Sequence, residues 1–355
     1  MRWSANGALS RPAGTLRPFS RRLVLPARRT ASRAPAGLLD ELLGRRIVFV
    51  AGKGGTGKTT VAAALCLLAA KRGKEVLGVE VDAKGDLSAA LGSTGASFKA
   101  EVVQPGVSVI GLHAEESLQE YLRIYFKVPR LARMTPLARV FDFIATAVPG
   151  PRDMLVTGKI AFEERRRDES KRPVWDLIVV DCSASGHILA QLRAARSMLE
   201  LVRGGLIRSQ IEWIDGVISD SRRTSAVLTA LPEEMPVVET VELKREIAKQ
   251  RTLHVALCVL NRMPPEPLPA AARRVLADLA TADAEVRARV PAVAHIGADL
   301  ELGERLYRSA QTQARRLRAE IGVPVVNVPL TAVRTGLATT RAVAAALRDG
   351  SEASA

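Results

Sequence analysis

The sequence predicts an α/β fold, a doubly wound and mainly parallel sheet with an inserted helical subdomain. Short apolar runs typical of buried strands alternate with helical segments along most of the chain. A glycine-rich turn joins the first apolar run to the first helical segment. Several of the runs end in an acidic or amide side chain, which suits strands whose carboxyl ends border a ligand site.

The expected strands are short and rich in Val, Ile and Leu, and most are bounded by charged or turn-forming residues. They lie at residues 47–51, 75–81, 106–113, 175–181, 225–230, 255–260 and 323–328. The expected helices lie at residues 61–68, 188–218, 270–321 and 339–347, with another beginning near Pro232. This alternation favours crossover connections, and therefore parallel pairing of the strands.

The stretch after the first expected strand reads G-K-G-G-T-G-K-T-T. Its glycines let the backbone turn its amides inward, and these amides form a cradle for phosphate oxygens together with the helix N-terminus. In this pattern Lys58 reaches the β- and γ-phosphates, and the Thr59 hydroxyl holds Mg²⁺. The sequence therefore predicts that the chain binds a nucleoside triphosphate. The predicted contacts are Gly52, Lys53, Gly54, Gly55, Thr56, Gly57, Lys58, Thr59 and Thr60.

Two of the later strands end in aspartate. Asp82 follows the run 75–81, where its carboxylate points toward the γ-phosphate; a helix N-cap is the alternative role. Asp181 ends the run 175–181 in the Walker B arrangement, which predicts a Mg²⁺ ligand acting through a water molecule.

A second lysine, Lys53, stands beside the first glycine, where a plain phosphate loop does not require one. The K-G-G-x-G-K-[ST] pattern resembles the deviant Walker A class of P-loop NTPases, which are dimeric ATPases. That class includes partition and septum-site ATPases, nitrogenase iron protein, and the arsenite-pump and tail-anchored-protein-targeting ATPases. The resemblance implies that Lys53 reaches the nucleotide of a partner subunit. It therefore implies a homodimer, or a heterodimer with a paralogue.

Further motifs narrow the resemblance to the ArsA-type ATPases, over roughly residues 45–348. Residues 82–88 resemble their first switch, D-P-A-H-x-L-S-D, although Ala-Lys-Gly replaces Pro-Ala-His. On this register Asp82 positions the attacking water, while Lys53 and Lys58 neutralise developing charge. Residues 181–187 resemble the second switch, D-T-A-P-T-G-H, which implies that Gly186 senses the γ-phosphate.

Two residues match the family's base-binding positions. Asn261 follows the run 255–260 and can both donate to and accept from adenine, which favours ATP. Pro329 begins the base-side loop after the last expected strand.

The resemblance implies Mg²⁺-dependent ATP hydrolysis coupled to the handling of a cargo. That cargo is an anion or metalloid passed to a membrane pump, or a hydrophobic segment of a membrane protein. The family's metalloid thiolate cluster is not apparent in the sequence. An alternative is a partition- or septum-site-type ATPase that switches on DNA or a membrane, which the switch motifs disfavour. The net charge of +15 is weak evidence for nucleic acid, because residues 1–39 contribute eight arginines and no acidic residue.

The expected organisation is a disordered basic extension over 1–39, an ATPase domain over 40–348 and a tail over 349–355. A helical insertion is expected at 114–168, extended by 188–218. We interpret the extension as a tail without function or an upstream start, with a transit peptide as the alternative. No apolar run approaches the roughly 18 residues of a membrane helix, and the three cysteines form no C-x-x-C pair. A cytoplasmic setting is therefore expected.

Overall fold

The computed structural model of the chain describes residues 37–81, 84–95, 97–112, 151–183, 185–250, 253–280, 296–332 and 336–352. All of them belong to one unit of the chain, residues 31–355. The expected extension over 1–39 lies outside the described residues up to position 36. Its last residues belong to the folded part, because helix α1 spans Leu38–Leu43 and buries Leu39.

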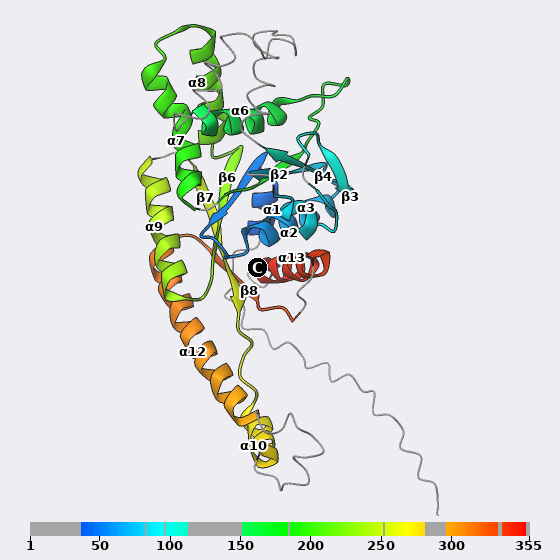
Figure 1. Cartoon of the computed structure of the whole chain (residues 1–355), viewed down its shortest axis with the longest axis vertical. Helices are drawn as coiled ribbons and strands as arrows, with labels where there is room; N and C mark the ends of the chain where they lie inside the picture. The colour runs from blue at the N-terminus through cyan, green and yellow to red at the C-terminus, as the bar shows by residue number, and fades with distance from the viewer. Residues whose placement is uncertain are drawn as a thin grey trace, which may run out of the picture. The chain divides into compact units, whose positions relative to one another are not determined.

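The described strands form one sheet of eight, in the order β3-β4-β2-β5-β1-β6-β7-β8 (Figure 1). All neighbours pair in parallel except the edge pair β3 and β4. The predicted doubly wound, mainly parallel sheet is therefore confirmed. The strands are β1 (Ile47–Gly52), β2 (Val76–Val81), β3 (Glu101–Gln104), β4 (Val107–Leu112), β5 (Leu177–Asp181), β6 (Thr224–Ala230), β7 (His254–Met263) and β8 (Val325–Pro329).

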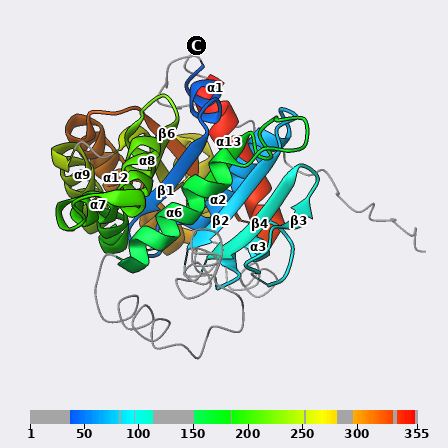
Figure 2. The ribbon, with the colours of Figure 1, turned by 90° about the horizontal axis from the view of Figure 1, so that it is seen from above.

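Helices cover both faces of this sheet and bury two apolar clusters against it (Figure 2). One cluster packs under α1, α2 (Lys58–Ala70), α3 (Asp86–Ala90) and α13 (Gly336–Glu352). The other packs under α6 (Pro151–Arg165), α7 (Ser185–Leu201), α8 (Gly205–Ser219), α9 (Glu234–Gln250) and α12 (Ile296–Ile321). Helix α10 (Ala270–Ala280) packs against α12. Most strands are buried on both faces, which is why they read as continuous apolar runs.

The structure extends the expected elements in a few places. Strand β3 was not predicted, because its two valines stand between polar residues and form no longer apolar run; Val102 is 77% accessible. Strand β7 continues through Asn261 to Met263, where the register with β8 is irregular. The last helix runs to Glu352 rather than ending at 347, so residues 349–352 belong to it and not to a tail.

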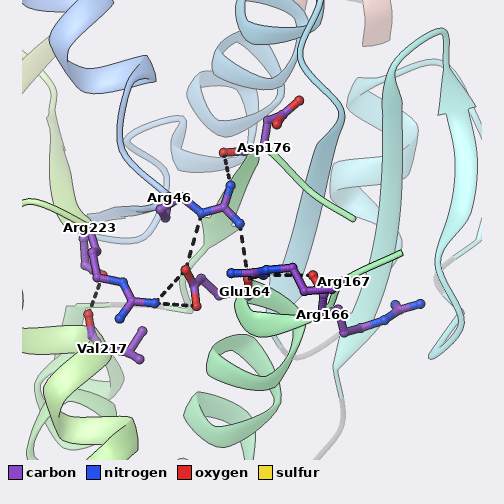
Figure 3. A network of polar contacts seen from close by, with 8 residues as sticks. Arg46, Glu164, Arg166, Arg167, Asp176, Val217 and Arg223 are labelled. Atoms are coloured by element: carbon purple, nitrogen blue, oxygen red, sulfur yellow. Dashed lines mark hydrogen bonds and ion pairs between the residues drawn. The ribbon is translucent and has the colours of Figure 1, made fainter. Parts of the chain in front are cut away.

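The expected helical insertion is described only in its last part. Residues 113–150 lie outside the described residues, whereas α6 packs against α7 and α8. The end of α6 is fixed to the sheet by the buried carboxylate of Glu164, which is 1% exposed (Figure 3). Arg223 donates to both of its oxygens at 2.8 Å, and Arg46 Nε lies 3.4 Å from Oε1. Because these arginines directly precede β1 and β6, the network connects α6 to the amino-terminal ends of these two strands.

Candidate nucleotide site

The loop between β1 and α2 needs glycine at two of its positions. Gly57 caps α2 with φ +89°, and an added Cβ would overlap the amide nitrogen of Asn261. Gly52 has φ +156°, and a Cβ there would overlap the backbone oxygen and the hydroxyl of Thr229. The loop is therefore packed closely against the ends of β6 and β7, where a side chain cannot be accommodated.

Thr56 braces the middle of this loop and is fully buried. Its hydroxyl donates to the backbone oxygen of Lys53 at 2.8 Å and shares a hydrogen bond of 2.8 Å with the hydroxyl of Thr229. The side-chain amide of Asn261 donates to the backbone oxygen of Thr56 at 2.9 Å. These bonds hold the loop against the sheet. At Gly54 and Gly55, by contrast, no heavy atom lies within 4 Å of an added Cβ.

The two lysines of the loop both contact groups of their own chain. Lys58 Nζ donates to the backbone oxygen of Lys53 at 3.3 Å. Lys53 Nζ forms an ion pair with Glu239 on α9. The side chain of Lys53 remains 49% exposed, so its ammonium group is at the surface beside the loop.

Thr59 and Asp181 meet at the carboxyl end of β5. The Thr59 hydroxyl donates to Asp181 Oδ2 at 2.7 Å, while Oδ1 is buried without a hydrogen-bond partner among the described residues. The pKa of Asp181 is raised to about 7, chiefly by burial; nearby Glu80 and Asp86 contribute to the rise, and the Thr59 hydrogen bond and Lys58 oppose it. A partly buried hydroxyl beside a buried carboxylate, one oxygen of which has no hydrogen-bond partner among the described residues, fits a hard divalent cation such as Mg²⁺.

Glu80 is a site residue that the sequence analysis missed. It lies in β2 opposite Asp181 in β5, and it is 3% exposed. Its two carboxylate oxygens accept the backbone N–H groups of Gly85, at 3.1 Å, and Asp86, at 2.8 Å. Glu80 thus holds the start of α3 beside the Thr59–Asp181 pair. A carboxylate inside an otherwise apolar strand was the available signal, since buried charges are rare unless they are bonded.

The other residues predicted to contact the nucleotide or the attacking water lie at the ends of the neighbouring strands or outside the described residues. Asp82 lies outside the described residues. Gly186 is in the first turn of α7, directly after β5 and Asp181. Asn261 is next to the loop, but its amide donates to Thr56 and accepts from the Arg262 N–H at 2.9 Å, so contact with a base remains a prediction. Pro329 ends β8 and is exposed, paired in register with Met263.

Comparison with known proteins agrees with this geometry. Residues 47–306 match the model of the CobQ/CobB/MinD/ParA nucleotide binding domain. The chain belongs to this family. The match runs from β1 through the loop, Asp181 and Asn261 into α12, so it includes most of the site.

Individual relatives narrow the family to its ArsA type. The ATPase BagA of Mycobacterium tuberculosis is 34% identical over 231 residues, covering 64% of this chain and 67% of that protein. A putative arsenical pump-driving ATPase of Aquifex aeolicus is 25% identical, covering 62% of this chain and 81% of that protein. The ATPase get3 of Schizosaccharomyces japonicus is 30% identical, covering 43% of this chain and 46% of that protein. The predicted assignment to the ArsA-type family and the predicted ATPase activity are confirmed.

None of the helices that the structure describes combines the length and apolar content needed to cross a lipid bilayer.

Proposed function

We propose that this ArsA-type ATPase is a Mg²⁺-dependent dimeric switch, in which the state of the bound nucleotide controls the arrangement of the helices around α7. The Thr59–Asp181 pair with its unpartnered buried oxygen carries the proposal, because it provides a cation site next to a phosphate cradle. Thr59 and Asp181 would hold Mg²⁺, which neutralises charge on the β- and γ-phosphates. Lys58 binds the same phosphates, and Asp82 orients the attacking water.

The coupling follows from chain connectivity. Helix α7 begins at Ser185, four residues after Asp181, and it packs against α6 and α8. A change at Gly186 when the γ-phosphate leaves would therefore act directly on the first turn of α7. The segment 113–150 leads into α6, so the same movement would reach the expected helical insertion.

The cargo proposed for this insertion is a hydrophobic segment of a membrane protein. The chemistry of the cysteines disfavours the metalloid alternative. Cys66, Cys182 and Cys258 are all unpaired and buried, and burial raises the pKa of each thiol, that of Cys258 to about 12. Neutral buried thiols are poor metalloid ligands. Unpaired cysteines also suit a reducing cytoplasm.

Two variants test the switch. Asp82→Asn should bind ATP normally and hydrolyse it at a rate at least about 100-fold lower, as expected for loss of the group that positions water. Lys53→Ala should stay monomeric with Mg·ATP in light scattering, because the cross-subunit charge is lost. Full turnover by Asp82→Asn, or ATP-dependent dimers of Lys53→Ala with undiminished hydrolysis, would contradict the proposal.

The cargo is tested separately with the wild-type protein. A fluorescent peptide carrying a single hydrophobic membrane anchor should bind with Mg·ATP and be released on hydrolysis. Absence of binding in both nucleotide states would refute this cargo class and leave the switch intact. ATP-dependent binding to DNA that weakens with salt would instead favour a partition-type role.

A further inference from the structure

The ion pair between Lys53 and Glu239 joins the glycine-rich loop to α9. Lys53 Nζ contacts Glu239 Oε1, and the side chains are 49% and 24% exposed. The backbone oxygen of Lys53 also accepts from Thr56 and from Lys58 Nζ. The backbone of Lys53 is therefore fixed, and only its long side chain can change conformation to reach a different acceptor.

Helix α9 holds Glu239 in a defined place. The adjacent Thr240 is 1% exposed, and its hydroxyl donates to the backbone oxygen of Pro236 at 2.7 Å. Val237 and Val241 are buried in the core under α9. Because the helix is anchored on both sides of Glu239, the carboxylate offers Lys53 a fixed acceptor.

The surface around the ion pair suits contact with a second subunit. Met235 lies one turn before Glu239 on the same helix face and is 65% exposed. Methionine is enriched in protein interfaces relative to the rest of the protein surface. In the dimer proposed above, the partner's nucleotide would compete with Glu239 for this lysine.

We propose that Glu239 is the positioning residue for Lys53: it retains the lysine in its own subunit until the triphosphate of the partner subunit takes the ammonium group. This inference rests on the dimer proposed above. An ion pair this exposed shifts an equilibrium by roughly fivefold at most. A triphosphate carries several negative charges and outcompetes one carboxylate, so Glu239 raises the nucleotide concentration needed for dimerisation without preventing it.

The test removes the charge of Glu239 and keeps its size. In Glu239→Gln, the Mg·ATP concentration for half-maximal dimer formation should fall roughly two- to fivefold. Without nucleotide, Lys53 should react faster with an amine-directed reagent, measured by mass spectrometry of its peptide. Glu242→Gln is the matched control, since Glu242 is an exposed glutamate on the same helix, α9. It should change neither quantity.

A double variant shows whether Glu239 acts through Lys53. The double variant Lys53→Ala/Glu239→Gln should behave as Lys53→Ala alone, whereas a purely structural role would add a second defect. Unchanged Lys53 labelling and dimerisation in Glu239→Gln would overturn the inference, and so would weaker dimerisation. If Lys53→Ala is impaired while Glu239→Gln matches wild type, only this inference fails. If Lys53→Ala dimerises normally, the proposed dimer switch fails first.

Discussion

Replacing Gly57 with alanine measures how strongly the glycine-rich loop depends on its packing. Gly57 has φ +89°, a conformation that costs an L-residue about 1–2 kcal/mol. The new Cβ also overlaps Asn261 Nδ2, which must move and give up its hydrogen bond to Thr56. That bond is worth about 0.5–1.5 kcal/mol. We expect Gly57→Ala to lower the free energy of unfolding by about 1.5–3.5 kcal/mol.

The matched control is Gly55→Ala in the same loop. Gly55 has φ +82°, but no heavy atom lies within 4 Å of an added Cβ. It should therefore show only the backbone strain, about 1–2 kcal/mol. Both variants are compared by urea unfolding without nucleotide, so that ligand binding does not contribute.

A third variant isolates the steric part. With Asn261→Ala as the background, Gly57→Ala should cost no more than Gly55→Ala, because the overlapping group is gone. Equal losses for Gly57→Ala and Gly55→Ala in the wild-type background would refute the reasoning. The loop would then owe its shape to backbone conformation alone.

Two further predictions concern the end of α6. Glu164→Gln should lower the free energy of unfolding by about 1–3 kcal/mol, because Arg223 and Arg46 lose a buried charged partner. The control is Glu169→Gln at an exposed position, which should cost less than about 0.5 kcal/mol. Similar losses in the two variants would contradict this account. Burial alone would raise the pKa of Glu163, but Lys159 and its other donors lower the pKa below the ordinary 4.5. Glu163 therefore stabilises the fold fully above pH 4.5, and this contribution is lost as the pH falls through the lowered value. The stability difference between wild type and Glu163→Gln should shrink in acid unfolding experiments, and a difference that stays constant down to about pH 3 would contradict the assignment.

In the proposed switch, the ion pair with Glu239 would make the availability of Lys53 depend gradually on nucleotide concentration. A lysine committed to its own subunit by a strong buried ion pair would resist transfer, whereas an unpaired one would be available at any nucleotide concentration. The exposed pair lies between these limits. Helix α7 follows β5 and packs against α6 and α8, so in the proposed switch the nucleotide site would act on these helices as well as on the dimer contact.

The sequence by itself predicted the sheet and the glycine-rich loop, and it singled out the two residues proposed as cation ligands. Buried parallel strands require continuous apolar runs, and a phosphate cradle requires glycine, lysine and threonine at fixed spacing. Each of these features can therefore be recognised within a short stretch of the sequence. Asp181 was predictable because a strand end beside the loop has few other uses for a carboxylate. The structure places its Oδ2 2.7 Å from the Thr59 hydroxyl, and binding of Mg²⁺ by the two residues stays a prediction.

Only the tertiary structure decided which distant groups meet. Glu80 reads as an irregularity in an apolar strand until folding brings the amides of Gly85 and Asp86 onto its carboxylate. The pairing of Lys53 with Glu239 joins residues 186 positions apart. Asn261 contacts Thr56 because β7 lies two strands from β1 in the sheet. Such contacts depend on strand order and helix packing, which no local pattern of residues encodes.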